Sequence, residues 1–256
     1  MTGTLAAIFT PPQIAYPGGG QTVLMLLRWV HFVAGVTWVG LLYFFNLVNV
    51  PFQRELDATT KLTVVPKLMR KALWWFRWSS VVTVLAGVAY WMHIVETDVG
   101  NTIAGGEPVS GATMFGGFFV IWTLAFAVEM GVLISPAEGL KSGPVLGGIV
   151  GIASLAAAYV FLSMNQHGWE SNRALAIGIG GGLGWFMMLN VWGIIWRMQK
   201  KIISWTEAAA GGAAMPAEAA KLARLTFLIS RVNFWLSFPM LFFMGAASHY
   251  IMFATR

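Results

Sequence analysis

The stretch RWVHFVAGVTWVGLLYFFNLVNV (28–50) decides the fold class, because no Asp, Glu, Lys or Arg follows its first residue. A helix of about 20 apolar residues is long enough to cross the hydrocarbon core of a bilayer. Five further apolar runs of similar length follow it. The sequence therefore predicts an all-α, polytopic transmembrane bundle over 22–253, with six spans near 22–49, 72–95, 113–135, 144–164, 174–198 and 225–253. Residues 1–21 are predicted to form a tail outside the membrane, and residues 199–224 a cytoplasmic connector.

The composition excludes a soluble domain and several kinds of redox centre. Hydrophobic residues make up 57% of the 256 residues and charged residues 10%, far fewer charges than a soluble surface carries. The chain has no Cys, which excludes iron–sulfur clusters and the CxxCH attachment of c-type haem. Membrane proteins concentrate Lys and Arg in their cytoplasmic loops, which explains the net charge of +6. No nucleic-acid partner is therefore predicted.

The basic residues predict the orientation of the spans. Thirteen of the 16 Lys and Arg lie in or beside the loops after spans one, three and five. The thirteen are Arg54, Lys61, Lys67, Arg70, Lys71, Arg77, Lys141, Arg197, Lys200, Lys201, Lys221, Arg224 and Arg231. Only Arg28, Arg173 and Arg256 lie on the other side. Since cytoplasmic loops are enriched in Lys and Arg, both termini are predicted to be periplasmic in a multi-pass protein of a bacterial inner membrane.

All four histidines of the chain fall on the predicted periplasmic side. They are His31, His93, His167 and His249. Ionisable residues within spans are costly and mark functional sites, although a histidine at the end of a span is often a solvated interfacial residue. His31 is the deepest, about nine residues inside the first span, and shares a helix face with Arg28 and Gly35.

This arrangement of residues predicts a non-covalent, b-type haem near the periplasmic face. An imidazole ligates haem iron, a glycine one turn away leaves room for the macrocycle, and an arginine can pair with a propionate. We expect His31 and His249 to be the axial ligands, with His93 as the next candidate and Arg28 and Gly35 completing the site. His167, in NQHGWE (165–170), is the weakest candidate because an exposed position is expected.

Two further features have structural explanations. Glu129 lies in the inner half of the third span, where an ion pair with Arg77 or Arg231 is favoured over a proton relay. The run GIGGGLG (178–184) opens a membrane helix without a preceding strand, so it predicts close helix packing rather than a dinucleotide site.

Four blocks of sequence carry a family resemblance. They are RWVHFVAGVTWVGLLYFFNLVNVPF (28–52), WWFRW (74–78), NVWGIIWRMQKKI (190–202) and SRVNFWLSFPMLFFMGAASHY (230–250). In this order they resemble the membrane domain of the bacterial membrane-bound urate hydroxylases. The resemblance implies urate as substrate and a periplasmic cytochrome c domain as electron acceptor. Because this chain has no CxxCH, a separate periplasmic c-type cytochrome is the expected partner.

The sequence therefore predicts a membrane-embedded b-haem redox protein, resembling a urate hydroxylase-like oxidoreductase, that passes electrons from a reduced small molecule to a c-type cytochrome. One alternative is a copper-binding or copper-transport protein, because Met92, Met164 and Met252 lie near the outer histidines and thioethers with imidazoles suit copper. Another is a non-catalytic subunit of a larger respiratory or photosynthetic complex.

Overall fold

The computed structural model describes residue 15 and residues 17–253, and this part of the chain is helical without strands. Most of the tail predicted over 1–21 lies outside the described residues. The elements are α2 (Gly19–Tyr43), η1 (Phe44–Asn49), α3 (Val50–Glu55), α4 (Ala58–Ala104), α5 (Ala112–Ile134), η2 (Glu138–Lys141), α6 (Gly143–Asn165), α7 (Asn172–Asn190), η3 (Val191–Ile195), α8 (Trp196–Ala210) and α9 (Ala219–Ala246).

Six helical segments are long and apolar enough to cross a membrane, which confirms the predicted all-α, six-span fold. Two of them are composite. The first runs through α2, η1 and α3, and the fifth through α7, η3 and α8; in each, a π-helical turn joins two α-helices. Residues 199–224, predicted as a connector, are helical to Ala210 and again from Ala219.

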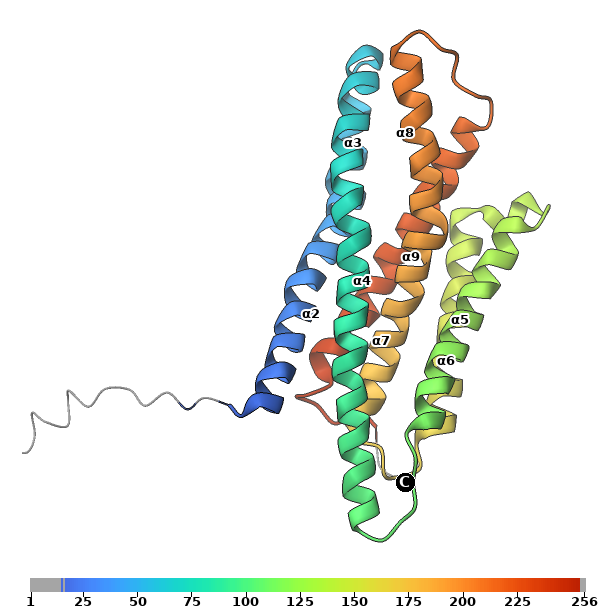
Figure 1. Cartoon of the computed structure of the whole chain (residues 1–256). Coiled ribbons are helices and arrows are strands. Elements are labelled where there is room, and N and C mark those ends of the chain that lie inside the picture. The colour runs from blue at the N-terminus through green and yellow to red at the C-terminus, as the bar shows by residue number, and fades with distance from the viewer. Residues whose placement is uncertain (1–14, 16, 254–256) are drawn as a thin grey trace, which may run out of the picture.

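The helices form an elongated antiparallel bundle (Figure 1). Helix α2 packs along α4, α7 along α9, and α5 along α6, with α7 the most buried of the spans. The start of α2, the end of α4, the α6–α7 loop and the end of α9 lie together at the bottom of Figure 1. We call this the histidine end, because the positions of His93, His167 and His249 in the chain all fall there.

At the opposite end, α4 and α8 extend past α5 and α6 and form a projecting stalk (Figure 1). Arg70 of α4 and Glu207 of α8 form an ion pair of 2.6 Å between these two helices. The stalk begins at Asp57, whose carboxylate accepts a hydrogen bond of 2.9 Å from the backbone of Thr60 and so caps α4. This hydrogen bond holds the pKa of Asp57 below its usual range.

The glycines of α7 permit close helix packing, as the sequence predicts. A Cβ atom at Gly178 would overlap the ring of Phe161 on α6, and one at Gly182 would overlap the indole of Trp122 on α5. Both aromatic side chains are fully buried. The run GIGGGLG therefore sets how closely α5 and α6 approach α7.

The ion pair predicted for Glu129 is not formed, and that prediction was wrong. Among the described residues neither carboxylate oxygen of Glu129 has a hydrogen-bond partner or an ion-pair partner. The guanidinium carbon of Arg77 lies 3.9 Å from the ring centroid of Trp196, and that of Arg231 lies 5.2 Å from the ring centroid of Phe227. The two arginines that were expected to pair with Glu129 thus make cation–π contacts instead.

Candidate functional site

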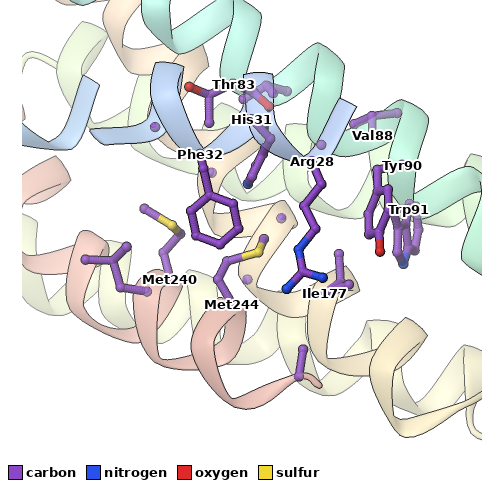
Figure 2. Close-up of a pocket in the computed structure, with 18 of the residues that line it drawn as sticks. Arg28, His31, Phe32, Thr83, Val88, Tyr90, Trp91, Ile177, Met240 and Met244 are labelled. Carbon is purple, nitrogen blue, oxygen red and sulfur yellow. Dashed lines mark hydrogen bonds between the residues drawn. The ribbon is translucent and has the colours of Figure 1, made fainter. Parts of the chain in front are cut away.

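A cavity of about 390 Å³ lies between α2, α4, α7 and α9 towards the histidine end. This volume is within the range of small-molecule and cofactor sites, roughly 300–1,000 Å³. Its lining is mostly aliphatic, aromatic and glycine residues, with a few polar side chains from α2, α4 and α7. Figure 2 shows side chains of all four helices converging on this space.

His31 of α2 is the imidazole of this cavity. Its Nδ1 lies 2.8 Å from the carbonyl oxygen of Thr83 on α4. A carbonyl only accepts, so Nδ1 must carry the hydrogen, which leaves the lone pair of Nε2 free. Figure 2 shows the ring between Phe32 and Arg28. Metal-bound histidines commonly donate their other ring N–H to a backbone carbonyl in this way, which fixes the tautomer and the orientation.

Gly87 of α4 makes this position of the His31 ring sterically available. A Cβ atom at Gly87 would lie 2.7 Å from Nδ1 and 2.8 Å from Cε1 of His31, closer than real side chains approach. The ring therefore lies directly against the backbone of α4. Sequence reasoning missed Gly87, because the contact joins residues 56 positions apart and a single sequence gives no signal for it.

Further glycines leave the walls of the cavity open. The predicted Gly35 lines it from α2, and α7 contributes Gly180, Gly181 and Gly184. A Cβ atom at Gly184 would meet nothing within 4 Å, and at Gly35 only Thr83, at 3.6 Å. A wall without side chains accommodates a flat, rigid ring better than one lined by branched residues.

Two arginines line the cavity near the histidine end. Arg28 comes from α2, as the sequence predicts, and Arg173 comes from the first turn of α7. Arg173 donates a hydrogen bond to the hydroxyl of Tyr90, but its buried Nε has no acceptor among the described residues. The cavity thus offers cationic donors suited to carboxylates. Sequence reasoning counted Arg173 only for topology.

Two thioethers line the cavity from α9. Met240 is buried and Met244 is partly buried, and Figure 2 shows both beside Phe32. The methyl carbon of Met244 lies over α7, 3.6 Å from a Cβ atom placed at Gly181. A methionine sulfur is an axial ligand in some haem proteins. The sequence did not single out these residues, because methionine is common in membrane helices.

The other predicted ligands lie outside this cavity. His249 is exposed in the turn after α9, next to the lining residue Ser248, and His93 is exposed on the last part of α4. The structure therefore brings together Arg28, His31 and Gly35, but it does not bring His93 or His249 into the same cavity.

His167 lines a second, polar cavity of about 690 Å³, together with Met164, Asn165 and Glu107. Its Nδ1 lies 2.9 Å from Oε1 of Glu170, and its backbone N–H donates to Oε2 at 2.8 Å. The Glu170 side chain is buried whereas the His167 ring is exposed. The contact with Glu170 fixes the His167 ring in the α6–α7 loop, where it lines a different cavity from His31.

The family model described as urate oxidase N-terminal matches residues 55–256. The chain belongs to this family. No curated protein and no solved structure matches it. In this member of the urate oxidase N-terminal family, the matched range includes the cavity walls from α4, α7 and α9, whereas α2 with His31 precedes it.

Proposed function

We propose that this chain is a membrane-embedded b-haem redox protein, a urate hydroxylase-like oxidoreductase. It passes electrons from a reduced small molecule, urate in keeping with its family, to a separate periplasmic c-type cytochrome. It lies in a bacterial inner membrane with the histidine end on the periplasmic side. The observation that carries the proposal is the His31 ring, fixed through Nδ1 by the Thr83 carbonyl in a cavity with glycine walls.

The residues of the cavity fit haem b. Nε2 of His31 is available as an iron ligand. The glycines of α2 and α7 leave space for the macrocycle, and Arg28 and Arg173 would pair with its two propionates. The buried Nε of Arg173, which has no acceptor among the described residues, favours an anionic group at this position. When bound, haem supplies a one-electron carrier whose potential the axial ligands adjust.

The surrounding residues would exclude water from the centre. Trp38, Trp91 and Phe118 line the cavity and are buried, so its walls are apolar beyond the arginines. The position near the histidine end would put the site close to one membrane surface, within reach of a soluble acceptor.

A reduced-minus-oxidised absorption spectrum of the purified protein, paired with iron and copper analysis, tests this function. We expect a b-type α-band and iron. Urate is expected to reduce the chromophore, and an added c-type cytochrome to reoxidise it. A b-type spectrum that urate fails to reduce would retain haem but reject urate as the donor.

Copper binding is the second candidate function. Thioethers and imidazoles line both cavities: Met240, Met244 and His31 one of them, and Met164 and His167 the other. Such soft ligand sets suit copper. The same metal analysis separates the candidates, because copper without iron supports this one and neither metal supports a non-catalytic subunit of a larger complex.

The variant Gly87→Ala is expected to weaken haem binding about 10- to 100-fold, the usual cost of losing an outer-shell contact of a metal ligand. The added Cβ displaces the His31 ring and breaks its hydrogen bond with Thr83. Haem titration of the apoprotein measures the affinity. Gly40→Ala on α2 is the matched control, because its Cβ would meet nothing within 4 Å; equal losses in both variants would contradict the role of Gly87.

A further inference from the structure

Glu129 of α5 is a fully buried carboxyl group without a compensating charge. Its relative exposure is 0%, and both oxygens lack hydrogen-bond partners among the described residues. Helices α6 and α7 pack most extensively against α5. Trp91 of α4 and Gly193 of η3 also contact it, at Phe118 and Phe126, and no described Lys, Arg or His forms an ion pair with Glu129. Helix α6 carries no charged residue, α7 carries only Arg173 in its first turn, and Glu138 and Lys141 of the adjoining η2 pair with each other.

An ionised carboxylate in such surroundings is costly. Removal of an unpaired charge from water into a low-dielectric interior costs several kcal/mol, on the order of the stability of a whole domain. A buried acid without a partner is therefore held in its neutral, protonated form. A neutral carboxylic acid has one O–H donor, and it needs an acceptor.

Asn190 of α7 supplies that acceptor. Its side chain neighbours Glu129, and its Nδ2 donates to Oδ1 of Asn233 at 2.9 Å. Asn233 in turn donates from Nδ2 to the backbone carbonyl of Met187 at 3.0 Å. Since that carbonyl only accepts, the orientation of both amides is determined. Oδ1 of Asn190 is then left without a donor among the described residues.

We propose that Glu129 is a proton-binding site of the bundle, which holds an exchangeable proton as a neutral acid and donates its O–H to Oδ1 of Asn190. The proton satisfies two buried acceptors at once, one on α5 and one on α7. This inference does not depend on the proposed haem, because no residue of the haem cavity takes part in it.

Further buried polar residues lie beyond Asn233. Asn233 lies one turn from Ser230 on α9, and Oγ of Ser230 accepts a hydrogen bond of 2.9 Å from Nδ2 of Asn46. Asn46 and Asn49 belong to the π-helix η1 of the first span, and the Oδ1 of each lacks a donor among the described residues. Polar groups thus continue from Glu129 towards the end opposite the histidines.

Both clusters of buried amides adjoin π-helices. Asn190 directly precedes η3, and Asn46 and Asn49 lie within η1. Short π-helical turns inside α-helices are rare, and they occur frequently at functional sites because they redirect side chains and backbone groups. Two of them beside one file of buried amides favour a functional rather than a purely structural arrangement.

Infrared difference spectroscopy of the full chain in lipid nanodiscs at neutral pH tests the proposal. We expect the carbonyl stretch of one protonated carboxylic acid, absent from Glu129→Gln and shifted when H₂O is replaced by D₂O. The glutamine is isosteric and still has an N–H donor for Asn190, so it should fold. Glu218→Gln, at an exposed position, is the matched control and should keep the full band.

Three outcomes would overturn the proposal. An unchanged carbonyl region of protonated carboxylic acids in the unmodified chain and Glu129→Gln would mean that Glu129 is ionised. A band that D₂O does not shift within hours would mean a sealed, structural acid. Loss of the band on adding NaCl would assign the site to a metal cation instead. Because the readout does not involve haem, none of these results bears on the proposed redox function.

Discussion

The variant His31→Ala is expected to be purified with at least about 100-fold less haem than the unmodified chain. Loss of outer-shell contacts alone costs 10- to 100-fold in metal affinity, and this substitution removes the proposed ligand itself together with its hydrogen bond of 2.8 Å to Thr83. The fold should persist, because the change removes side-chain atoms beside an existing cavity. Haem content per protein, measured by absorbance and iron analysis, gives the result.

The matched control is His167→Ala, since this histidine lies in the α6–α7 loop and lines a different cavity. It should keep full haem content. Full haem content in both variants would reject His31 as a ligand. His249→Ala and Met244→Leu then distinguish the predicted second ligand from the thioether in the cavity, because replacing a methionine ligand lowers the reduction potential.

The variant Gly182→Ala is expected to lower the free energy of unfolding by about 3 kcal/mol or more, the upper range for overpacked cores. A Cβ atom here would overlap the indole of Trp122, and that side chain is fully buried between α5 and α7. Because the indole is rigid and fully buried, either it or α5 must shift away from α7. The temperature of unfolding in detergent, and the yield of folded protein, measure the effect.

Gly148→Ala on α6 is the control, because its Cβ would meet nothing within 4 Å, and surface substitutions usually change stability by less than about 0.5 kcal/mol. The double variant Gly182→Ala, Trp122→Phe should recover part of the loss, since a phenyl ring is smaller than an indole. An unchanged unfolding temperature for Gly182→Ala alone would contradict the packing described for α5 and α7.

The number of spans could be predicted from the sequence because apolar length alone determines it. The ends of the helices could not. The first span is predicted to end near residue 49, but the helical segment continues through Pro51 to Glu55. The π-helix η1 joins α2 to α3 without ending the helical segment, and such turns have no reliable sequence signal.

The candidate site was predictable only within one helix. Arg28, His31 and Gly35 share a face at helical spacing, and the structure places all three in one cavity. Gly87 and Arg173 could not be found, because their roles come from how α4 and α7 pack against α2. The alternating direction of the spans predicts that His93 and His249 lie at the histidine end. The rotation of α4 and the turn after α9 determine how exposed these two side chains are.

The long helix α4 links the projecting stalk mechanically to the cavity. Arg70, held by Glu207 of α8, and Gly87, against which the His31 ring lies, belong to the same helix, without a proline between them. The separation is about 26 Å at 1.5 Å per residue. The backbone that supports the His31 imidazole therefore belongs to the same continuous helix as the stalk, so a displacement of the stalk would be carried along α4 to the cavity.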